Sequence, residues 1–182
     1  MSPPLPDAVL LIDGYNVIGA WYCLQETLAH HDMETARREL IETLISYSAF
    51  SGLQTKVVFD AYYRDTPGCC EDYTKDLAVH YTDFGQTADT FIEKFCASFR
   101  YVSDRRHRRL IVATSDNDQK LTVIGYGAEW MSALQLQGEV VDSQRRSRDR
   151  NRAEKSPRGR FLVNSLDLKS QQMLDKLRYG LK

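Results

Sequence analysis

The sequence lacks the features that mark membrane proteins, secreted proteins and nucleotide-driven enzymes. Its apolar runs are too short to span a bilayer, and the first six residues have neither the basic nor the apolar part of a secretory signal. Four cysteines among 182 residues are too few and too irregularly placed for a disulfide framework. A Gly-rich phosphate loop that ends in Lys-Ser/Thr is also absent. We therefore expect a cytoplasmic protein that has no membrane partner and uses no nucleotide cofactor.

The composition is that of a globular chain with one domain and some additional structure, since 42% of the residues are hydrophobic and 27% are charged. Short, unbroken apolar runs are typical of strands buried on both faces, and they occur at residues 8–12, 57–59, 110–113 and, more weakly, 77–82. Apolar side chains at helical spacing predict helices over residues 33–51, 88–99, 132–155 and 166–179. Residues 61–76 show no period and are expected to form a loop. The alternation predicts an α/β fold with a mostly parallel sheet.

Four aspartates stand where separate elements would bring them to one edge of such a sheet. Asp13, Asp60 and Asp116 follow three of the expected strands. Asp89 lies in the first turn of an expected helix. Each could singly cap a helix or hold a turn, and Asp116 with Gln119 resembles a capping box. Because ligands of open α/β sheets bind beyond the carboxyl ends of the strands, the four together predict a functional site.

A hard divalent cation would neutralise these clustered carboxylates, so Mg²⁺ or Mn²⁺ is the expected cofactor. Glu93 lies one helical turn after Asp89 and so joins the expected ligands. The expected metal ligands are Asp13, Asp89, Asp116 and Glu93. Asn16 adds a neutral oxygen that could orient a metal-bound water. Such a site suits the in-line attack of water on a phosphodiester, which needs no Ser, Cys or His nucleophile.

Positive charge is concentrated towards the carboxyl end of the chain. Between residues 145 and 160, eight basic residues stand against two acidic ones, which gives +6; the whole chain carries −1, so the remainder carries −7. Four of these side chains lie on one side of the expected helix, and we call them the basic arm: Arg145, Arg148, Arg152 and Lys155. We expect the basic arm to bind RNA phosphates, with Arg105 and Arg106 extending it. The alternatives are a solvated helix face and a solvated turn.

Four segments carry a resemblance: Leu11-Ile-Asp-Gly-Tyr-Asn-Val-Ile-Gly-Ala20, Val57-Val-Phe-Asp-Ala61, Gln86-Thr-Ala-Asp-Thr-Phe-Ile-Glu93 and Val112-Ala-Thr-Ser-Asp116. They resemble the motifs of the NYN domain, specifically its bacterial YacP-like branch. The resemblance implies a PIN-like three-layer sandwich with a mostly parallel central sheet and a C-terminal basic helical extension. It also implies a catalytic site at Asp13, Asp60, Asp89 and Asp116, with Asn16 beside it. We expect the nuclease domain to span residues 1–141 and the basic extension, packed on the same domain, to span residues 142–182.

The sequence therefore predicts a divalent-metal-dependent endoribonuclease that hydrolyses single-stranded RNA. The studied YacP-like member cuts mRNA on the ribosome, so the resemblance makes mRNA and the ribosome candidate partners. The alternative is a non-catalytic RNA- or ribosome-binding module. The acidic residues favour catalysis, because carboxylates that face phosphate bring a binding module no gain. A phosphatase of the haloacid dehalogenase type is disfavoured, because it needs a second aspartate where Tyr15 stands.

Overall fold

A six-stranded sheet forms the centre of the structure, a computed structural model that describes residues 8–60, 68–99, 101 and 108–155. The strands are β1 (Ala8–Asp13), β2 (Gln54–Phe59), β3 (Cys69–Thr74), β4 (Leu77–Tyr81), β5 (Arg109–Ala113) and β6 (Glu129–Met131). They lie in the order β3-β4-β2-β1-β5-β6. β3 runs antiparallel to β4, and all other neighbouring strands are parallel. The sheet is therefore mostly parallel, as predicted.

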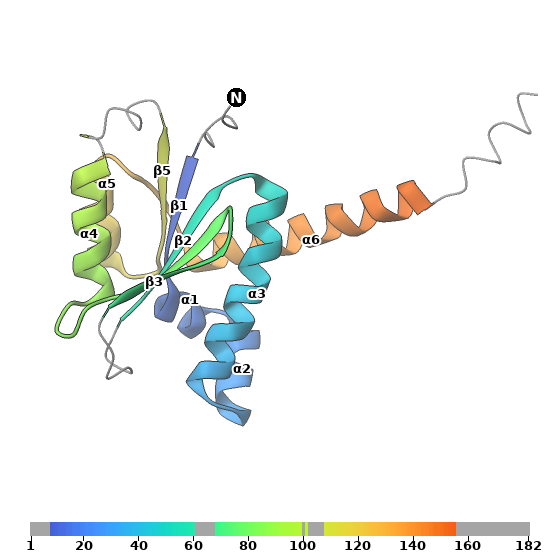
Figure 1. Cartoon of the computed structure of the whole chain (residues 1–182), viewed down its shortest axis with the longest axis horizontal. Coiled ribbons are helices and arrows are strands. Elements are labelled where there is room, and N and C mark those ends of the chain that lie inside the picture. Colours follow the sequence, from blue (N-terminus) through green and yellow to red (C-terminus); the bar gives the residue numbers. More distant parts are fainter. Residues whose placement is uncertain (1–7, 61–67, 100, 102–107, 156–182) are drawn as a thin grey trace, which may run out of the picture. The chain divides into compact units, whose positions relative to one another are not determined.

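Helices cover both faces of this sheet and make it the middle of three layers (Figure 1). They are α1 (Gly14–Ala20), α2 (Tyr22–His30), α3 (Met33–Ser51), α4 (Ala88–Phe99), α5 (Asn117–Gly125) and α6 (Ala133–Lys155). Leu10 and Ile12 of β1 point into a core shared with α1, α2, α3 and the start of α6. Val9 and Leu11 point into a second core, shared with α4 and α5. β1 is thus buried on both faces, which explains its unbroken apolar sequence.

The predicted strands, and the helices predicted over residues 33–51, 88–99 and 132–155, are confirmed. α3 ends where the sequence indicated, at Gly52, whose positive φ of 70° is the left-handed conformation common after helices. The helix predicted over residues 166–179 lies outside the described residues. Every helix within the described ranges is too short or too polar to cross a bilayer.

The prediction of a loop over residues 61–76 is wrong for its second half. Cys69–Thr74 forms the edge strand β3, which pairs with β4. Its side chains are polar and largely exposed, so no apolar pattern indicated a strand; the strand is held by its hydrogen bonds to buried β4. The segment Asp13-Gly14-Tyr15-Asn16, whose glycine favours a tight turn, is also predicted wrongly as a turn from the sequence, because Gly14 already begins α1. α2 and the three-residue β6 were not predicted either.

The chain divides into two compact units, residues 1–145 and residues 146–182. The first unit holds the whole sheet, α1 to α5 and the first half of α6. Within the second unit the structure describes residues 146–155, the second half of α6. The domain boundary expected at residues 141 and 142, and the packing of the extension on the domain, stay predictions.

The junction between β1 and α1 is tightly packed against β2. Phe59, at the end of β2, is fully buried. Its ring packs edge to face against that of Tyr15, with the two ring centroids 5.1 Å apart. A Cβ added to Gly14 would lie 2.3–2.8 Å from three carbons of the Phe59 ring. Only a residue without a side chain fits between Asp13 and Tyr15 at this distance.

Replacing Gly14 with alanine tests this close approach. We expect Gly14→Ala to lower the free energy of unfolding by about 1–3 kcal/mol in urea denaturation, because the core would be overpacked. Gly19→Ala, in the same helix, is the matched control: a Cβ there meets nothing within 4 Å. That change should be neutral or slightly stabilising. Equal effects of the two substitutions would contradict the steric explanation.

Candidate functional site

Three parallel strands end side by side at one edge of the sheet. Ile12 of β1 is level with Ala113 of β5, and Asp13 is level with Val58 of β2. Asp60 therefore follows β2 at this edge, and Asp116 follows β5 by three residues. α4 starts seven residues after β4 ends and carries Asp89 in its first turn. The four aspartates thus reach the same edge from four different elements, as the sequence indicated.

Asp13 is the buried member of this group, with 7% of its surface exposed. Its Oδ1 accepts a hydrogen bond from the backbone N–H of Asn16 at 3.0 Å and so caps α1. Burial raises the pKa of Asp13 to about 6, against the smaller opposing effect of the Asn16 hydrogen bond. Repulsion from the carboxylates of Asp89 and Asp116 contributes to the same rise in pKa. The folded protein therefore disfavours a charge on Asp13 unless a positive partner is present.

Asp89 is repelled by both of the remaining aspartates. The pKa of Asp89 is raised by partial burial first, and then by repulsion from Asp116 and Asp60. Asp116 caps α5, because its Oδ1 accepts hydrogen bonds from the backbone N–H groups of Asp118 at 2.8 Å and Gln119 at 3.0 Å. Asp116 therefore has a structural role and also belongs to the electrostatic cluster. We call Asp13, Asp60, Asp89 and Asp116 the aspartate cluster.

Gln119 is a member of this site that the sequence analysis missed. It was noted as half of a capping box, in which its side chain would return to the backbone N–H of Asp116. That N–H instead donates to Thr114 Oγ1 at 3.1 Å. The buried side chain of Gln119 turns to the aspartate cluster, where Nε2 donates to Asp89 Oδ1. A buried amide among carboxylates gives no signal in the sequence beyond its position near Asp116.

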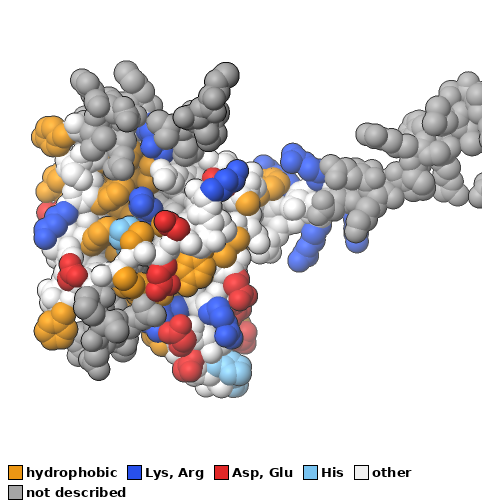
Figure 2. Space-filling view, in the orientation of Figure 1, with side chains coloured by type: hydrophobic (Ala, Val, Ile, Leu, Met, Phe, Trp, Pro, Cys, Tyr) orange, Lys and Arg blue, Asp and Glu red, His pale blue; other side chains and the backbone are white. Residues whose placement is uncertain are grey.

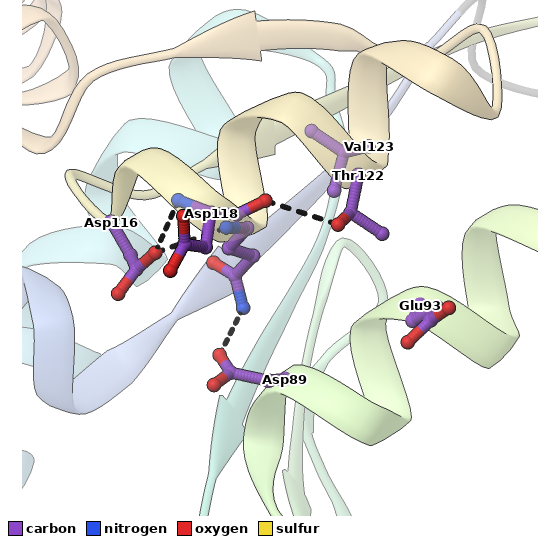
Figure 3. A pocket seen from close by; sticks show the side chains of 7 residues that line it. Asp89, Glu93, Asp116, Asp118, Thr122 and Val123 are labelled. Carbon is purple, nitrogen blue, oxygen red and sulfur yellow. Dashed lines mark hydrogen bonds between the residues drawn. The ribbon is translucent and has the colours of Figure 1, made fainter.

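A pocket of about 220 Å³ opens between α4 and α5 beside the aspartate cluster (Figure 3). Its walls are formed by Asp89, Glu93, Asp116, Asp118, Gln119, Thr122 and Val123. Asp118 lies with Asp116 at the start of α5, whereas Glu93 lies one turn further along α4 than Asp89 (Figure 3). The Glu93 carboxylate accepts the hydroxyl hydrogen of Tyr126 at 3.1 Å. Glu93 thus lines the pocket, and one of its carboxylate oxygens is hydrogen-bonded to Tyr126, the residue after α5.

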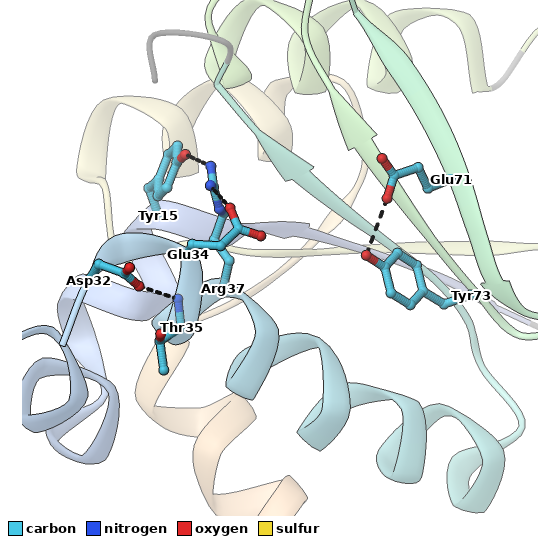
Figure 4. A network of polar contacts seen from close by, with 7 residues as sticks. All are labelled: Tyr15, Asp32, Glu34, Thr35, Arg37, Glu71 and Tyr73. Atoms are coloured by element: carbon cyan, nitrogen blue, oxygen red, sulfur yellow. Dashed lines mark hydrogen bonds and ion pairs between the residues drawn. The ribbon is translucent and has the colours of Figure 1, made fainter. Parts of the chain in front are cut away.

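Asn16 and Tyr15 fix the backbone around Asp13. Asn16 Oδ1 accepts the backbone N–H of Ser115 at 2.6 Å, which joins the start of α1 to the segment that follows β5. Tyr15 receives a hydrogen bond from Arg37 Nη1 at 2.9 Å, and Arg37 also bonds Glu34 (Figure 4). Asn16 therefore positions the Asp116 segment, and the water-orienting role that the sequence suggested stays a prediction.

The oxygen atoms at this site fit a divalent cation that is bound largely through water molecules. Within the described ranges, no three His, Cys, Asp or Glu side chains form a ready-made metal site. Mg²⁺ needs no such cage, because it keeps several waters and binds through one or two carboxylates. The mutual repulsion of the aspartates and a buried Gln119 Oε1 without a hydrogen-bond partner leave both charge and oxygen for an ion. The metal ligands expected from the sequence stay predictions.

The basic arm is only partly described. Arg145, Arg148 and Arg152 are exposed on α6. Figure 2 shows lysine and arginine side chains along the exposed part of this helix. The side chain of Lys155, and all of Arg105 and Arg106, lie outside the described residues. Three arginines at spacings of three and four are thus available to a polyanion.

The raised pKa of Asp13 predicts how stability depends on pH. Asp13 ionises near pH 3.8 when unfolded and near pH 6 when folded, so metal-free protein should lose stability as the pH rises from about 4 to about 6. Asp13→Asn keeps the cap acceptor and removes the charge. We expect it to raise the free energy of unfolding by about 2–3 kcal/mol at pH 8 and hardly at all at pH 3.5, in urea titrations with EDTA.

Asp32→Asn is the control of opposite sign. Asp32 caps α3, is exposed, and has a pKa that is lowered chiefly by the hydrogen bond from Thr35. Its carboxylate contributes stability above its unfolded pKa, and that contribution is lost as the pH falls. Asp32→Asn should therefore destabilise the protein at pH 8. A difference between Asp13→Asn and wild type that does not change with pH would contradict the assignment.

Comparison with known proteins identifies the family. The model of the YacP-like NYN domain matches residues 10–179. The chain is 34% identical over 165 residues to the uncharacterized protein YacP of Bacillus subtilis (strain 168), across 89% of this chain and 93% of that protein. The crystal structure of Rae1 (YacP) from Bacillus subtilis is similar, with a TM-score of 0.63, 30% identity, and coverage of 94% of this chain and 95% of that one. The crystal structure of a mutant of Rae1 gives a TM-score of 0.67, 30% identity, and coverage of 93% and 99%. This chain belongs to the YacP-like NYN domain family.

Proposed function

We propose that the protein is a divalent-metal-dependent endoribonuclease that hydrolyses phosphodiester bonds of single-stranded RNA. One observation carries the proposal: four elements deliver mutually repelling aspartates to the carboxyl edge of a parallel sheet. Membership of the YacP-like NYN domain family supports a nuclease-type, RNA-related role. The motif resemblance extends the proposal to mRNA on the ribosome.

The chemistry follows from what the aspartate cluster offers. Its members supply carboxylate oxygens and negative charge. Burial and neighbouring carboxylates raise the pKa of Asp13 and of Asp89, so a bound cation would stabilise their ionised forms. When bound, Mg²⁺ or Mn²⁺ would lower the pKa of a bound water and stabilise charge on the phosphate oxygens. The residues of the chain position the cation and the RNA: Asp13, Asp89 and Asp116 hold the acidic side, and the basic arm attracts the backbone of the RNA.

Substitution of Asp89 tests the proposed catalysis. Labelled single-stranded RNA, incubated with wild-type protein and Mg²⁺ or Mn²⁺, should be cut internally, and EDTA should abolish cutting. Asp89→Asn removes one cluster carboxylate while keeping the size of the side chain, so we expect cleavage to fall by at least about a hundredfold. Asp32→Asn makes the same chemical change at the exposed cap of α3, a residue that is not a member of the aspartate cluster. It should cut RNA like wild type.

The outcomes of this assay separate the two functions that the sequence left open. RNA binding without metal-dependent cleavage by wild-type protein would favour the non-catalytic module. Cleavage that persists unchanged in Asp89→Asn would show that the activity does not come from the aspartate cluster.

The basic arm predicts a salt-dependent contribution to RNA affinity. Arg148 and Arg152 lie one turn apart on α6, and each is expected to contact one phosphate. Arg148→Gln with Arg152→Gln should make the slope of log affinity against log salt shallower by about 1.4, since each contact to a single strand contributes about 0.7. The matched control replaces two exposed basic residues elsewhere, Arg38 and Lys75, by glutamine. Equal slopes for both double variants, measured by fluorescence anisotropy, would exclude the basic arm as the RNA contact.

A further inference from the structure

Gln119 connects three members of the aspartate cluster. Its Nε2 donates to Asp89 Oδ1, the bond that ends at Asp89 in Figure 3. Its side chain also lies close enough to Asp13 to oppose the rise in the pKa of that carboxyl, and its backbone N–H donates to Asp116 Oδ1 at 3.0 Å. Gln119 comes from the first turn of α5, and only 6% of its surface is exposed. One amide side chain thus lies between carboxylates that arrive from β1, α4 and the segment after β5.

The carbonyl oxygen of this amide is not satisfied. Among the described residues, the buried side-chain nitrogen and oxygen atoms without a hydrogen-bond partner are Gln119 Oε1 and Arg37 Nε. A buried carbonyl oxygen without a partner is unfavourable, and native proteins rarely keep one without a role. The donors of the Gln119 amide face carboxylates, while its acceptor faces none of the donors described. A cation, or a water held by one, would satisfy this acceptor.

We propose that Gln119 is the neutral ligand of the cation site, with Oε1 as the atom that meets the divalent cation or its bound water beside Asp13 and Asp89. The inference rests on the proposed function, because it needs a cation at the aspartate cluster. A neutral oxygen suits this place, since it adds a ligand without adding repulsion to the carboxylates already there. In the absence of the cation, the Nε2 group of the same amide holds the Asp89 carboxylate in place.

A purely structural role for Gln119 makes a different prediction. If the amide only bridges carboxylates through its N–H groups, then any substitution that removes these groups should have the same effect. If Oε1 is a ligand, a substitution that keeps an oxygen at this position should retain cation binding. Glutamate keeps the oxygen and loses the N–H groups, whereas methionine loses both and keeps the length and helix preference of the side chain.

The experiment measures Mn²⁺ binding to metal-free protein by isothermal titration calorimetry, and the shift of the melting temperature that Mn²⁺ causes. Gln119→Met should lower the Mn²⁺ affinity by about tenfold or more, as loss of a site-shaping group typically does. Gln119→Glu should bind Mn²⁺ at least as tightly as wild type. It should also melt lower in EDTA and show a larger Mn²⁺-induced shift, because a further carboxylate joins the aspartate cluster.

Thr122→Val is the matched control for the pocket. Thr122 lines the same pocket on the same helix, but its hydroxyl donates to the backbone carbonyl of Asp118 at 3.0 Å. Thr122→Val should therefore bind Mn²⁺ like wild type. This control separates the loss of a ligand from a general disturbance of α5.

The possible results test the proposed function and the role of Gln119 separately. Wild-type protein that binds no Mn²⁺ would overturn the proposed metal-dependent function itself. Wild-type binding that Gln119→Met leaves unchanged, or that Gln119→Met and Gln119→Glu reduce equally, would overturn the role of Gln119 alone. If Gln119→Met does not fold, Gln119→Glu decides, because binding weaker than wild type would exclude Oε1 as a ligand.

Discussion

Repulsion among four carboxylates at one edge of a parallel sheet is the constraint on which this structure depends. Asp13 is buried, and Asp89 and Asp116 lie close enough to raise its pKa. The fold offsets this repulsion with backbone N–H groups at helix N-termini. Asp13 caps α1, Asp116 caps α5, and Asp89 lies in the first turn of α4. The positive ends of three helices therefore meet at the acidic edge, where they favour negative charge. A divalent cation would complete the same compensation.

The packing around β1 maintains this arrangement. β1 supplies alternate residues to both hydrophobic cores, so its position in the sheet is fixed from two sides. Gly14 allows Phe59 to pack against the start of α1, and Asn16 ties that helix to the backbone N–H of Ser115. These contacts hold Asp13 against the segment that carries Asp116. The junction of β1 and α1 thus positions two members of the aspartate cluster relative to each other.

The sequence predicted the mostly parallel α/β sheet and the placement of the acids for one physical reason, whereas the PIN-like three-layer sandwich was implied by the motif resemblance. Strands buried on both faces leave unbroken apolar runs, and the residues after such runs must gather at one edge of a parallel sheet. β3 was not predicted because its side chains are mostly exposed and give no apolar pattern, and the strand forms through backbone pairing with β4. Gln119 escaped prediction because a residue that completes a capping box and a buried amide that turns to the carboxylates can stand at the same distance in sequence from Asp116. Contacts that depend on how separate elements pack, such as Tyr15 with Arg37, leave no local pattern.

The most direct test of the account is a crystal structure of the protein grown with Mn²⁺, in which anomalous scattering locates the ion. The account predicts Mn²⁺ at the carboxyl edge of the sheet, beside Asp13, Asp89 and Asp116, with oxygen ligands at about 2 Å and several waters. Aspartates that point apart, or that are paired with guanidinium groups and leave no room for an ion, would contradict it.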